Sequence, residues 1–212
     1  GRLLRFEPGA YRAVGVECEG RFARVGLADM AGGVQARETI ELGDFARTRD
    51  LSPIAAAIRR MCAAANGAPV LGVCIGFPAN LDPDAAAIVS YAAMDIQQPT
   101  SFAQVFPAFW REVELPVYLE NDANLACEGE AFLRRGAGGA ANMLYLSIGS
   151  GCGGAVRLDG KLRRGARCRA GEVGAMLLQP ALGAPGRSAA RETLEDAVCL
   201  AALERRFGAA LR

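Results

Sequence analysis

The run VLGVCIGF at residues 70–77 restricts the fold more than any other feature of this sequence. It contains no charged residue and is rich in β-branched side chains. A strand that is apolar at every position needs cover on both of its faces, which is typical of parallel strands flanked by helices. The run therefore predicts a buried strand with parallel neighbours.

Strand and helix patterns alternate around this run. Apolar and alternating stretches predict further strands at residues 13–18, 24–28, 116–120, 143–148 and 154–158, of which the first two form a hairpin. Helical spacing predicts helices at residues 53–66, 101–113, 121–135 and 189–207. We expect Ser52 to cap the first helix and Pro107 to interrupt the second. This order predicts an α/β fold, with one lobe at residues 1–115 and part of a second lobe at 116–212.

Composition and charge exclude several classes of protein. With 212 residues, 51% of them hydrophobic, the chain has enough apolar material for a buried core. Its formal net charge is +1, which provides no broad field to attract phosphate backbones. We find no apolar run long enough to cross a bilayer and no signal peptide. We therefore expect a cytoplasmic protein without a membrane partner, and no nucleic-acid binding by this piece alone.

The cysteine and histidine content limits the kinds of catalysis and cross-linking that the chain can support. The seven cysteines are scattered singly, without any C-x-x-C pair, and the chain has no histidine. Reduced cysteines that pack as small hydrophobic side chains explain this pattern better than disulfides or a thiol nucleophile. Because the commonest general base is absent, any catalysis would have to rely on carboxylates.

A glycine-rich segment follows the strand expected at residues 143–148. In the sequence LSIGSGCGG, the residues Gly149, Ser150 and Gly151 lie where that strand ends, so that backbone N–H groups can approach a phosphate without obstruction. A tight turn explains the same glycines equally well, because glycine clusters alone are weak signals. The segment by itself leaves both interpretations open.

Polar residues cluster where another strand meets a helix, in the sequence ENDAN at residues 120–124. Open α/β sheets bind ligands at this end of their strands. An amide offers a donor and an acceptor, and an adjacent carboxylate can accept a hydroxyl proton, so Asn121 and Asp122 suit a sugar. Helix capping explains one such residue well, but three are present, which favours binding. Glu172 and Glu195 add two carboxylates further along the chain.

The order of these motifs resembles the ROK family of bacterial repressors and sugar kinases, over residues 1 to about 196. The segments that carry the resemblance are GRLLRFEPGAYRAVGVE at 1–17, IGFPANLDP at 75–83, PVYLENDANLACEGE at 116–130 and IGSGCGGAVRLDGKLRRGARCRAGEVG at 148–174. The resemblance implies an actin-like (ribonuclease H-like) ATPase or sugar-kinase fold of two lobes. It also implies a winged helix-turn-helix DNA-binding domain upstream and a second lobe that is truncated.

Site residues follow from the resemblance position by position. Asn121 and Asp122 match residues that hydrogen-bond sugar hydroxyls, and Asp122 holds the place of the kinases' catalytic base. Glu172 and Glu195 match two further carboxylates that contact the sugar. We therefore expect these four side chains to converge on one sugar site, in the cleft between the two halves of the chain.

The phosphate side departs from the family pattern. Gly149, Ser150 and Gly151 match the loop that holds nucleotide phosphates in the kinases, with Ser150 in place of their usual Thr. The kinases' first phosphate loop, Asp-x-Gly-Gly-Thr, is replaced by ECEGR at residues 17–21. Glu19 would place a carboxylate where a phosphate has to approach, and like-charge repulsion opposes that arrangement. We therefore do not expect ATP use.

The zinc ligands of the family are also missing. Their positions are occupied by residues that are not useful zinc ligands, namely Ala175, Gly186, Ser188 and Thr193. Because structural zinc needs about four ligands, we expect no zinc and no other cofactor.

Three functions are compatible with these observations. We favour the sensing domain of a ROK-family transcriptional regulator, with a sugar or sugar derivative as effector, DNA bound only through the upstream domain, and no kinase activity. An ATP-dependent sugar kinase that uses Asp122 is the first alternative. A degenerate dimerisation scaffold that binds nothing is the second. In each case the resemblance implies a homodimer or higher homo-oligomer.

Overall fold

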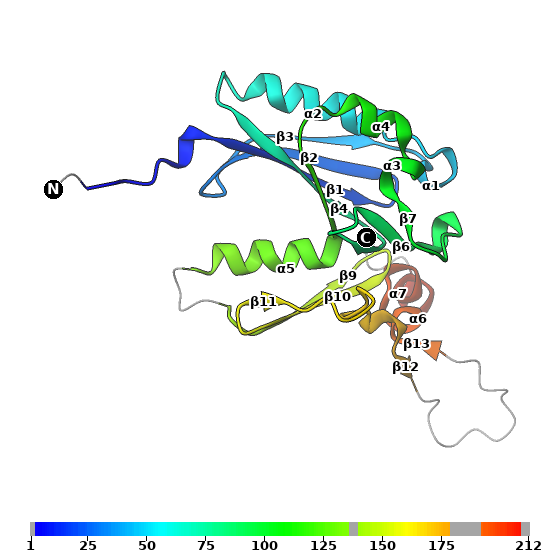
Figure 1. Ribbon diagram of the computed structural model, residues 1–212. Helices are drawn as coiled ribbons and strands as arrows, with labels where there is room; N and C mark the ends of the chain where they lie inside the picture. The colour runs from blue at the N-terminus through cyan, green and yellow to red at the C-terminus, as the bar shows by residue number, and fades with distance from the viewer. Residues whose placement is uncertain (1–2, 136–139, 179–191, 209–212) are drawn as a thin grey trace, which may run out of the picture. The chain divides into compact units, whose positions relative to one another are not determined.

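The computed structural model describes residues 3–135, 140–178 and 192–208 (Figure 1). The chain divides into two compact units, Gly1–Leu125 and Ala126–Arg212. The sequence placed a lobe boundary ahead of Pro116, whereas the strand that follows Pro116 pairs within the first unit. No helix in the described part of the chain is long and apolar enough to span a membrane.

The first unit is built on a five-stranded mixed sheet with the strand order β3-β2-β1-β4-β8. Its strands are β1 (Arg12–Glu19), β2 (Phe22–Asp29), β3 (Val34–Glu41), β4 (Val70–Phe77) and β8 (Val117–Asn121). The first three strands pair antiparallel, whereas β4 lies parallel to both β1 and β8. The apolar run at residues 70–77 is therefore a strand with parallel neighbours, as the sequence predicts, and it is buried over most of its length, although Leu71 is 50% exposed.

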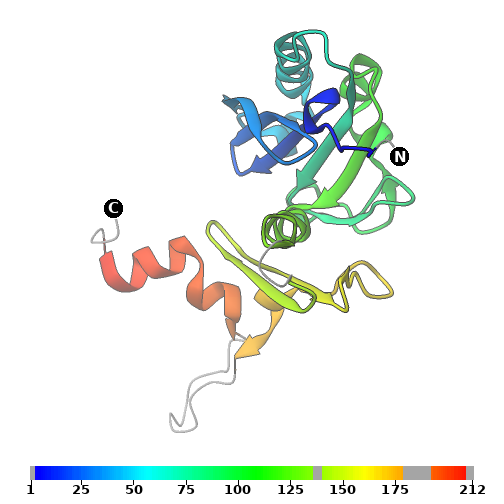
Figure 2. The same ribbon diagram turned by 90° about the vertical axis from the view of Figure 1, so that its left-hand side faces the viewer.

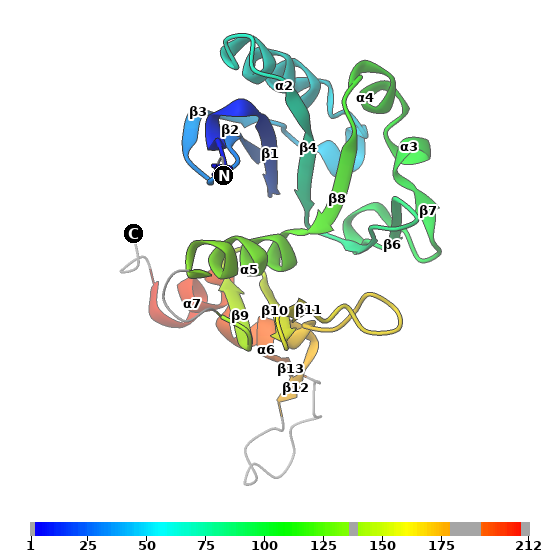
Figure 3. The ribbon, with the colours of Figure 1, turned by 60° about the vertical axis from the view of Figure 1, so that its left-hand side comes forward.

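Helices cover one face of this sheet (Figures 2 and 3). They are α1 (Phe45–Thr48), α2 (Ser52–Ala64), α3 (Phe102–Val105) and α4 (Pro107–Glu112). Pro107 separates α3 from α4, as predicted, because proline cannot donate a helical hydrogen bond. The prediction for Ser52 is wrong: it is the first residue of α2, and its N–H donates to the Asp50 carboxylate at 2.8 Å.

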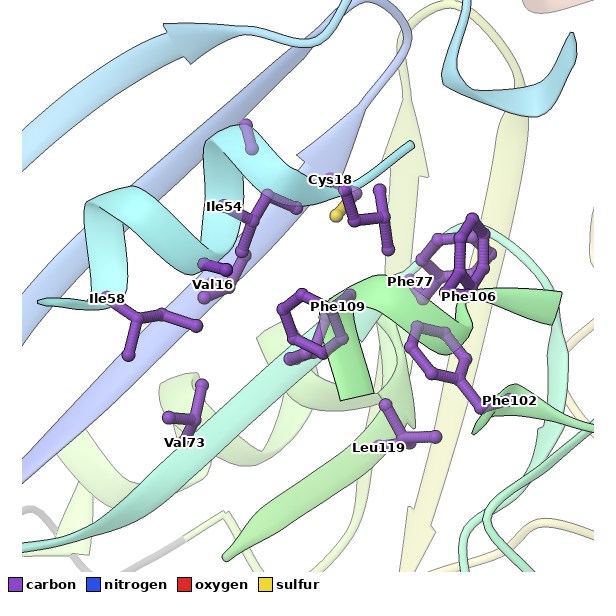
Figure 4. Close-up of a cluster of buried hydrophobic side chains, with 14 of the residues drawn as sticks. Val16, Cys18, Ile54, Ile58, Val73, Phe77, Phe102, Phe106, Phe109 and Leu119 are labelled. Atoms are coloured by element: carbon purple, nitrogen blue, oxygen red, sulfur yellow. The ribbon is translucent and has the colours of Figure 1, made fainter. Parts of the chain in front are cut away.

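Phe77, the last residue of β4, lies in the aromatic part of the hydrophobic core (Figure 4). Four rings meet the Phe77 ring edge-on, with centroids 5.4–5.7 Å away: Phe45, Tyr91, Phe102 and Phe106. Each edge-to-face pair adds about 0.5–1.5 kcal/mol to the stabilisation from burial. The cluster therefore anchors the carboxyl end of β4, which is the end that a ligand site in such a sheet would use.

A small antiparallel sheet follows β4, with the strands β5 (Asn80–Asp82), β6 (Ala87–Ser90) and β7 (Thr100–Ser101). The short helices η1 (Pro8–Ala10) and η2 (Ala92–Met94) complete the first unit. The sequence predicted neither this sheet nor β3. The strands of the small sheet are short, and β3 (VQARETIE) is polar and largely exposed, so it depends on pairing with β2.

The second unit contains an antiparallel sheet with the order β11-β10-β9, formed by β9 (Met143–Ile148), β10 (Cys152–Leu158) and β11 (Lys161–Leu162). Strands β9 and β10 correspond to the strands predicted at residues 143–148 and 154–158, and they form an antiparallel pair. Helix α5 (Asp122–Leu133) begins at the end of the first unit and continues into the second (Figure 1). The remaining short elements are η4 (Val173–Ala175), β12 (Leu177–Leu178) and β13 (Glu192–Thr193).

The sequence predicted one continuous helix at residues 189–207, and this prediction is wrong. The structure has two helices, α6 (Leu194–Val198) and α7 (Leu200–Phe207), separated by Cys199 in an extended conformation. Thr193 and Asp196 form a capping box that starts α6 at Leu194. Residues 189–191 lie outside the described part of the chain.

Candidate functional site

Asn121 and Asp122 lie where β8 ends and α5 begins. Asn121 pairs in register with Phe77, so the carboxyl ends of the two parallel strands meet here. The first residues of α5 also lie close to β4, since a side chain on Gly76 would approach Leu125 and Asp122 at 3.3 and 3.5 Å. The topology therefore delivers both predicted residues to the edge of the sheet where ligands bind.

The side chain of Asn121 is an N-cap for α5 as well as a candidate sugar contact. Its Oδ1 accepts the backbone N–H of Asn124 at 3.1 Å, which is the capping bond. Its Nδ2 donates to the carbonyl oxygen of Ala79 at 3.3 Å. The amide therefore ties the strand end to the bend at residues 78–79, and one N–H and one lone pair remain for a ligand.

Glu120 and Asn124 form a buried brace behind Asn121 that the sequence did not assign to the site. They are 7% and 6% exposed. One oxygen of Glu120 accepts the backbone N–H of Asn121 at 2.9 Å and the side-chain amide of Asn124 at 3.0 Å. The other side of that amide, Asn124 Oδ1, is buried without a partner among the described residues. The sequence alone could not assign this role, because the need of Glu120 for hydrogen-bond donors follows from its burial.

Asp122 is partly buried at the first turn of α5, and its Oδ1 accepts the backbone N–H of Ala123 at 2.9 Å. Burial raises the pKa of the Asp122 carboxyl above its ordinary value, and the charges of Glu17 and Glu19 add to that rise. The backbone hydrogen bond opposes both effects. A carboxylate with a raised pKa is a better acceptor for the proton of a sugar hydroxyl.

Glu17 and Glu19 extend the negative charge of this corner along β1. Both carboxylates pair with Arg24 on β2, at 2.7 and 2.8 Å. The three side chains are half exposed or more, so the pairs contribute little stability. With Asp122, this corner carries three carboxylates and one guanidinium, which disfavours a phosphate.

Cys18 lies between these two glutamates in the chain but is fully buried. Burial raises the pKa of its thiol to about 12, with smaller contributions from Asp122 and Glu17. The thiol therefore stays protonated and unreactive at neutral pH. This agrees with the interpretation of the cysteines as small hydrophobic side chains.

In the second unit, the glycine-rich segment forms the tight connection between β9 and β10. The N–H of Gly149 donates to the carbonyl oxygen of Gly151 at 2.9 Å. The N–H of Cys152 donates to the Glu195 carboxylate at 2.8 Å. A side chain on Gly151 would begin only 2.9 Å from the same carboxylate, so glycine allows Glu195 to approach this closely. Glu195 thus lies directly against the predicted phosphate loop.

Glu172 is positioned by two close backbone contacts. Gly171 lies against the carbonyl of Gly154, and Gly174 lies against that of Cys152, so closely that a side chain on either glycine would collide with the strand. Gly171 also has a φ of +95°, which only glycine adopts readily. Because Glu172 lies between these contacts in the chain, it stands beside the start of β10.

The structure therefore brings the predicted site residues together in two pairs. Asn121 and Asp122 share the strand end of the first unit, and Glu172 and Glu195 flank the start of β10 in the second. Convergence of the two pairs on one sugar stays a prediction, as does phosphate binding by residues 149–151.

Two of the four former zinc positions lie in the described part of the chain. Ala175 ends η4, and the Thr193 hydroxyl is hydrogen-bonded to Asp196 at 2.7 Å. Gly186 and Ser188 lie outside the described residues. The expectation that the chain binds no zinc stays a prediction.

Known proteins resemble this chain in sequence and in fold. A glucokinase of Halalkalibacterium halodurans is 34% identical over 139 residues, which are 62% of this chain and 39% of the relative. A xylose repressor of Caldicellulosiruptor bescii is 33% identical over 105 residues, 50% of this chain and 25% of the relative. The solved structure of a ROK family glucokinase from Streptomyces griseus, in complex with glucose and AMPPNP, is 26% identical with a TM-score of 0.68. The matched region is 92% of this chain and 59% of the glucokinase chain.

These comparisons confirm the predicted fold class, an actin-like sugar-kinase fold with a mixed sheet. The chain spans less than two thirds of each of these relatives. Repressors and kinases both occur among them, so the likeness alone does not choose between the two activities. The sequence pattern of the ROK family matches residues 13–212, and the chain therefore belongs to the ROK family.

Proposed function

We propose that this chain is the sugar-sensing domain of a ROK-family transcriptional regulator and does not transfer phosphate. Asn121 and Asp122 bind sugar hydroxyls from the first unit, and Glu172 and Glu195 do so from the second. An upstream winged helix-turn-helix domain reads the operator. Sugar binding biases the regulator between two states because the effector binds one of them more tightly.

The hydrogen bond between Glu195 and the N–H of Cys152 carries the argument against phosphoryl transfer. A phosphate loop works by offering free backbone N–H groups to an anion. Here the N–H of Cys152 is bonded to a carboxylate at 2.8 Å, and the N–H of Gly149 is bonded within the loop. A nucleotide phosphate would have to displace one anion and approach its negative charge. These bonds support a structural role for residues 149–151, which would orient Glu195 toward a neutral ligand and would not bind a phosphate.

The carboxylates of the first unit support the same conclusion independently. Glu17 and Glu19 occupy the segment that replaces the kinases' first phosphate loop, and their charge adds to the rise that burial causes in the pKa of Asp122. The single guanidinium of Arg24 is shared by these two carboxylates, so the three side chains together keep a net negative charge. The corner therefore favours a neutral sugar over a nucleotide.

Calorimetric titration with a panel of sugars, including glucose, xylose, other hexoses and amino sugars, tests the proposal. We expect one sugar to bind, and Asp122→Asn to weaken its binding by at least about tenfold, since the loss of a charged hydrogen bond costs about 1.5–3 kcal/mol. Asp84→Asn is the matched control, because Asp84 is an exposed aspartate in the same unit. Silence across the panel would instead support the degenerate scaffold.

An ATP-dependent sugar kinase is the second candidate, and the raised pKa of Asp122 favours it, because a kinase needs a base at this position. A coupled assay for ADP formation with each sugar of the panel separates the two functions. We expect no turnover above the rate without sugar. Turnover that disappears in Asp122→Asn and persists in Asp84→Asn would replace the sensor with a kinase.

A further inference from the structure

Positive charge is concentrated in one short segment of the second unit. Between residues 157 and 169 the chain has one acidic residue, Asp159, and six basic ones: Arg157, Lys161, Arg163, Arg164, Arg167 and Arg169. The segment therefore has a net charge of +5, and because the whole chain has +1, the remaining residues together carry −4. The balanced total conceals a strong local asymmetry.

Residues 161–169, here called the basic loop, start in β11 and lead toward η4 as an extended loop (Figure 3). The backbone closes this loop on itself. The N–H of Arg163 donates to Val156 O at 2.7 Å, and the N–H of Ala170 donates to Arg164 O at 3.0 Å. Gly165 and Cys168 adopt positive φ values of 71° and 52°, which turn the chain between these bonds. The basic loop is therefore preformed and does not have to fold on binding.

The basic side chains of this loop all face solvent. Five of them are exposed: Lys161, Arg163, Arg164, Arg167 and Arg169. Arg163 pairs with Asp159 at 3.1 Å, and this exposed pair is weak. Lys161 and Arg167 form no ion pair with any described residue. Arg157, which precedes the loop, is largely buried and pairs with Glu128 of α5.

We propose that the basic loop binds the phosphate backbone of duplex DNA without regard to sequence. Guanidinium groups match phosphate oxygens in geometry and charge, and four of the five cations are arginines. The loop has no aromatic residue on which an unpaired base could stack, which favours a duplex over a single strand. Its one large apolar residue, Leu162, is partly buried, so the loop has no exposed anchor for a protein partner.

This inference revises the expectation that the present piece has no affinity for nucleic acid. That expectation followed from the net charge of +1, but backbone binding depends on local charge density. In a regulator whose operator is read elsewhere, such a loop would add a contact that holds the sensor near DNA. The proposal is independent of sugar binding, because the basic loop contains none of the predicted sugar-binding residues.

Fluorescence anisotropy of a labelled duplex of arbitrary sequence, titrated with the chain at several salt concentrations, tests the proposal. Each of the three cations Lys161, Arg163 and Arg167 that contacts a phosphate adds about −0.9 to the slope of log K against log salt, so together they contribute about −2.7. The triple variant Lys161→Gln, Arg163→Gln, Arg167→Gln should have a slope that is smaller by about this amount and should bind at least about tenfold more weakly at low salt. These exposed substitutions leave the backbone bonds of the loop in place.

The matched control is the triple variant Arg5→Gln, Arg37→Gln, Arg111→Gln, which removes the same charge from exposed residues outside the loop. We expect its affinity and salt slope to equal those of the unchanged chain. An equal loss of DNA affinity in both triple variants would show that the basic loop is not the binding site. The absence of DNA binding at low salt would also overturn the proposal. Tighter binding to a single strand, to poly-glutamate or to phosphatidylserine vesicles would overturn the choice of duplex DNA.

Discussion

The strand end of the first unit and the glycine loop of the second hold their polar groups by different means. Asn121 and Asp122 stand on a dense interior, in which Phe77 is fully buried and the brace of Glu120 and Asn124 is less than a tenth exposed. Side chains fill the space behind this site. Packing and buried hydrogen bonds therefore set its geometry.

The glycine loop has much less cover from side chains. The strand that leads into it exposes Leu144, Leu146 and Ile148 to between 51% and 61%. Its geometry comes instead from close backbone contacts at glycines and from the Glu195 carboxylate. The contrast shows that the first site is vulnerable to the loss of side-chain volume and the second to its addition.

Removal of the Phe77 ring should have the largest effect. Phe77→Ala takes a fully buried ring from the aromatic cluster, and we expect it to lower the free energy of unfolding by about 3–5 kcal/mol. Urea denaturation followed by circular dichroism measures this change. Phe22→Ala, at a ring that is 51% exposed, should cost less than about 1 kcal/mol. Similar costs for the two variants would mean that the cluster does not anchor β4.

Addition of one methyl group should damage the second unit. In Gly174→Ala the new carbon collides with the carbonyl of Cys152, a backbone group that cannot move aside easily. We expect a loss of about 1–3 kcal/mol or more by the same denaturation experiment. Gly129→Ala should have the opposite effect on the free energy of unfolding. Gly129 lies within α5 with open space around it, so alanine should stabilise the fold by about 0.5–1 kcal/mol.

Glu195 should contribute less to the free energy of unfolding than Phe77 or Gly174, because Glu195 is exposed. Glu195→Ala removes the acceptor of the Cys152 N–H, and we expect a loss of about 1 kcal/mol. Hydrogen exchange of the Cys152 amide should become faster in this variant. Glu192→Ala, at an exposed glutamate in β13, should leave that amide unchanged. Unchanged exchange in Glu195→Ala would contradict the contact.

The pH dependence of Asp122 should give the smallest change in stability. Its pKa in the folded chain is raised above the ordinary 3.8, so ionised Asp122 destabilises the folded state. Stability from this group is present below pH 3.8 and is lost as the pH rises through the folded pKa. Asp122→Asn should therefore be more stable than the unchanged chain at neutral pH and not at pH 3. Denaturation at both values checks this, and a variant that is less stable at neutral pH would contradict it.

The sequence was sufficient where one local signal determined the structure. The apolar run at 70–77 predicted a strand with parallel neighbours, and Pro107 predicted a bend or a break in its helix. It failed where a distant partner decides. β3 is a strand because it pairs with β2, and at the break after Cys199 the N–H of Leu200 donates to the distant carbonyl oxygen of Gly149 at 2.7 Å.

The candidate site shows the same limit. The position of Asn121 and Asp122 at a strand end could be inferred from the order of elements alone. The roles of Glu120 and Asn124 could not, because they depend on burial and on three hydrogen bonds that meet in one turn. The hydrogen bond between Glu195 and the Cys152 N–H joins residues 43 positions apart, and no local sequence pattern predicts it.

A double-mutant cycle on sugar binding tests the central claim most directly. With the sugar identified by the panel, calorimetry compares Asp122→Asn, Glu172→Gln, the double variant and the unchanged chain. If one sugar bridges both units, the two losses in binding free energy should fail to add by at least about 1 kcal/mol. Losses that add to within about 0.5 kcal/mol, or a Glu172→Gln variant that binds like the unchanged chain, would contradict a shared site.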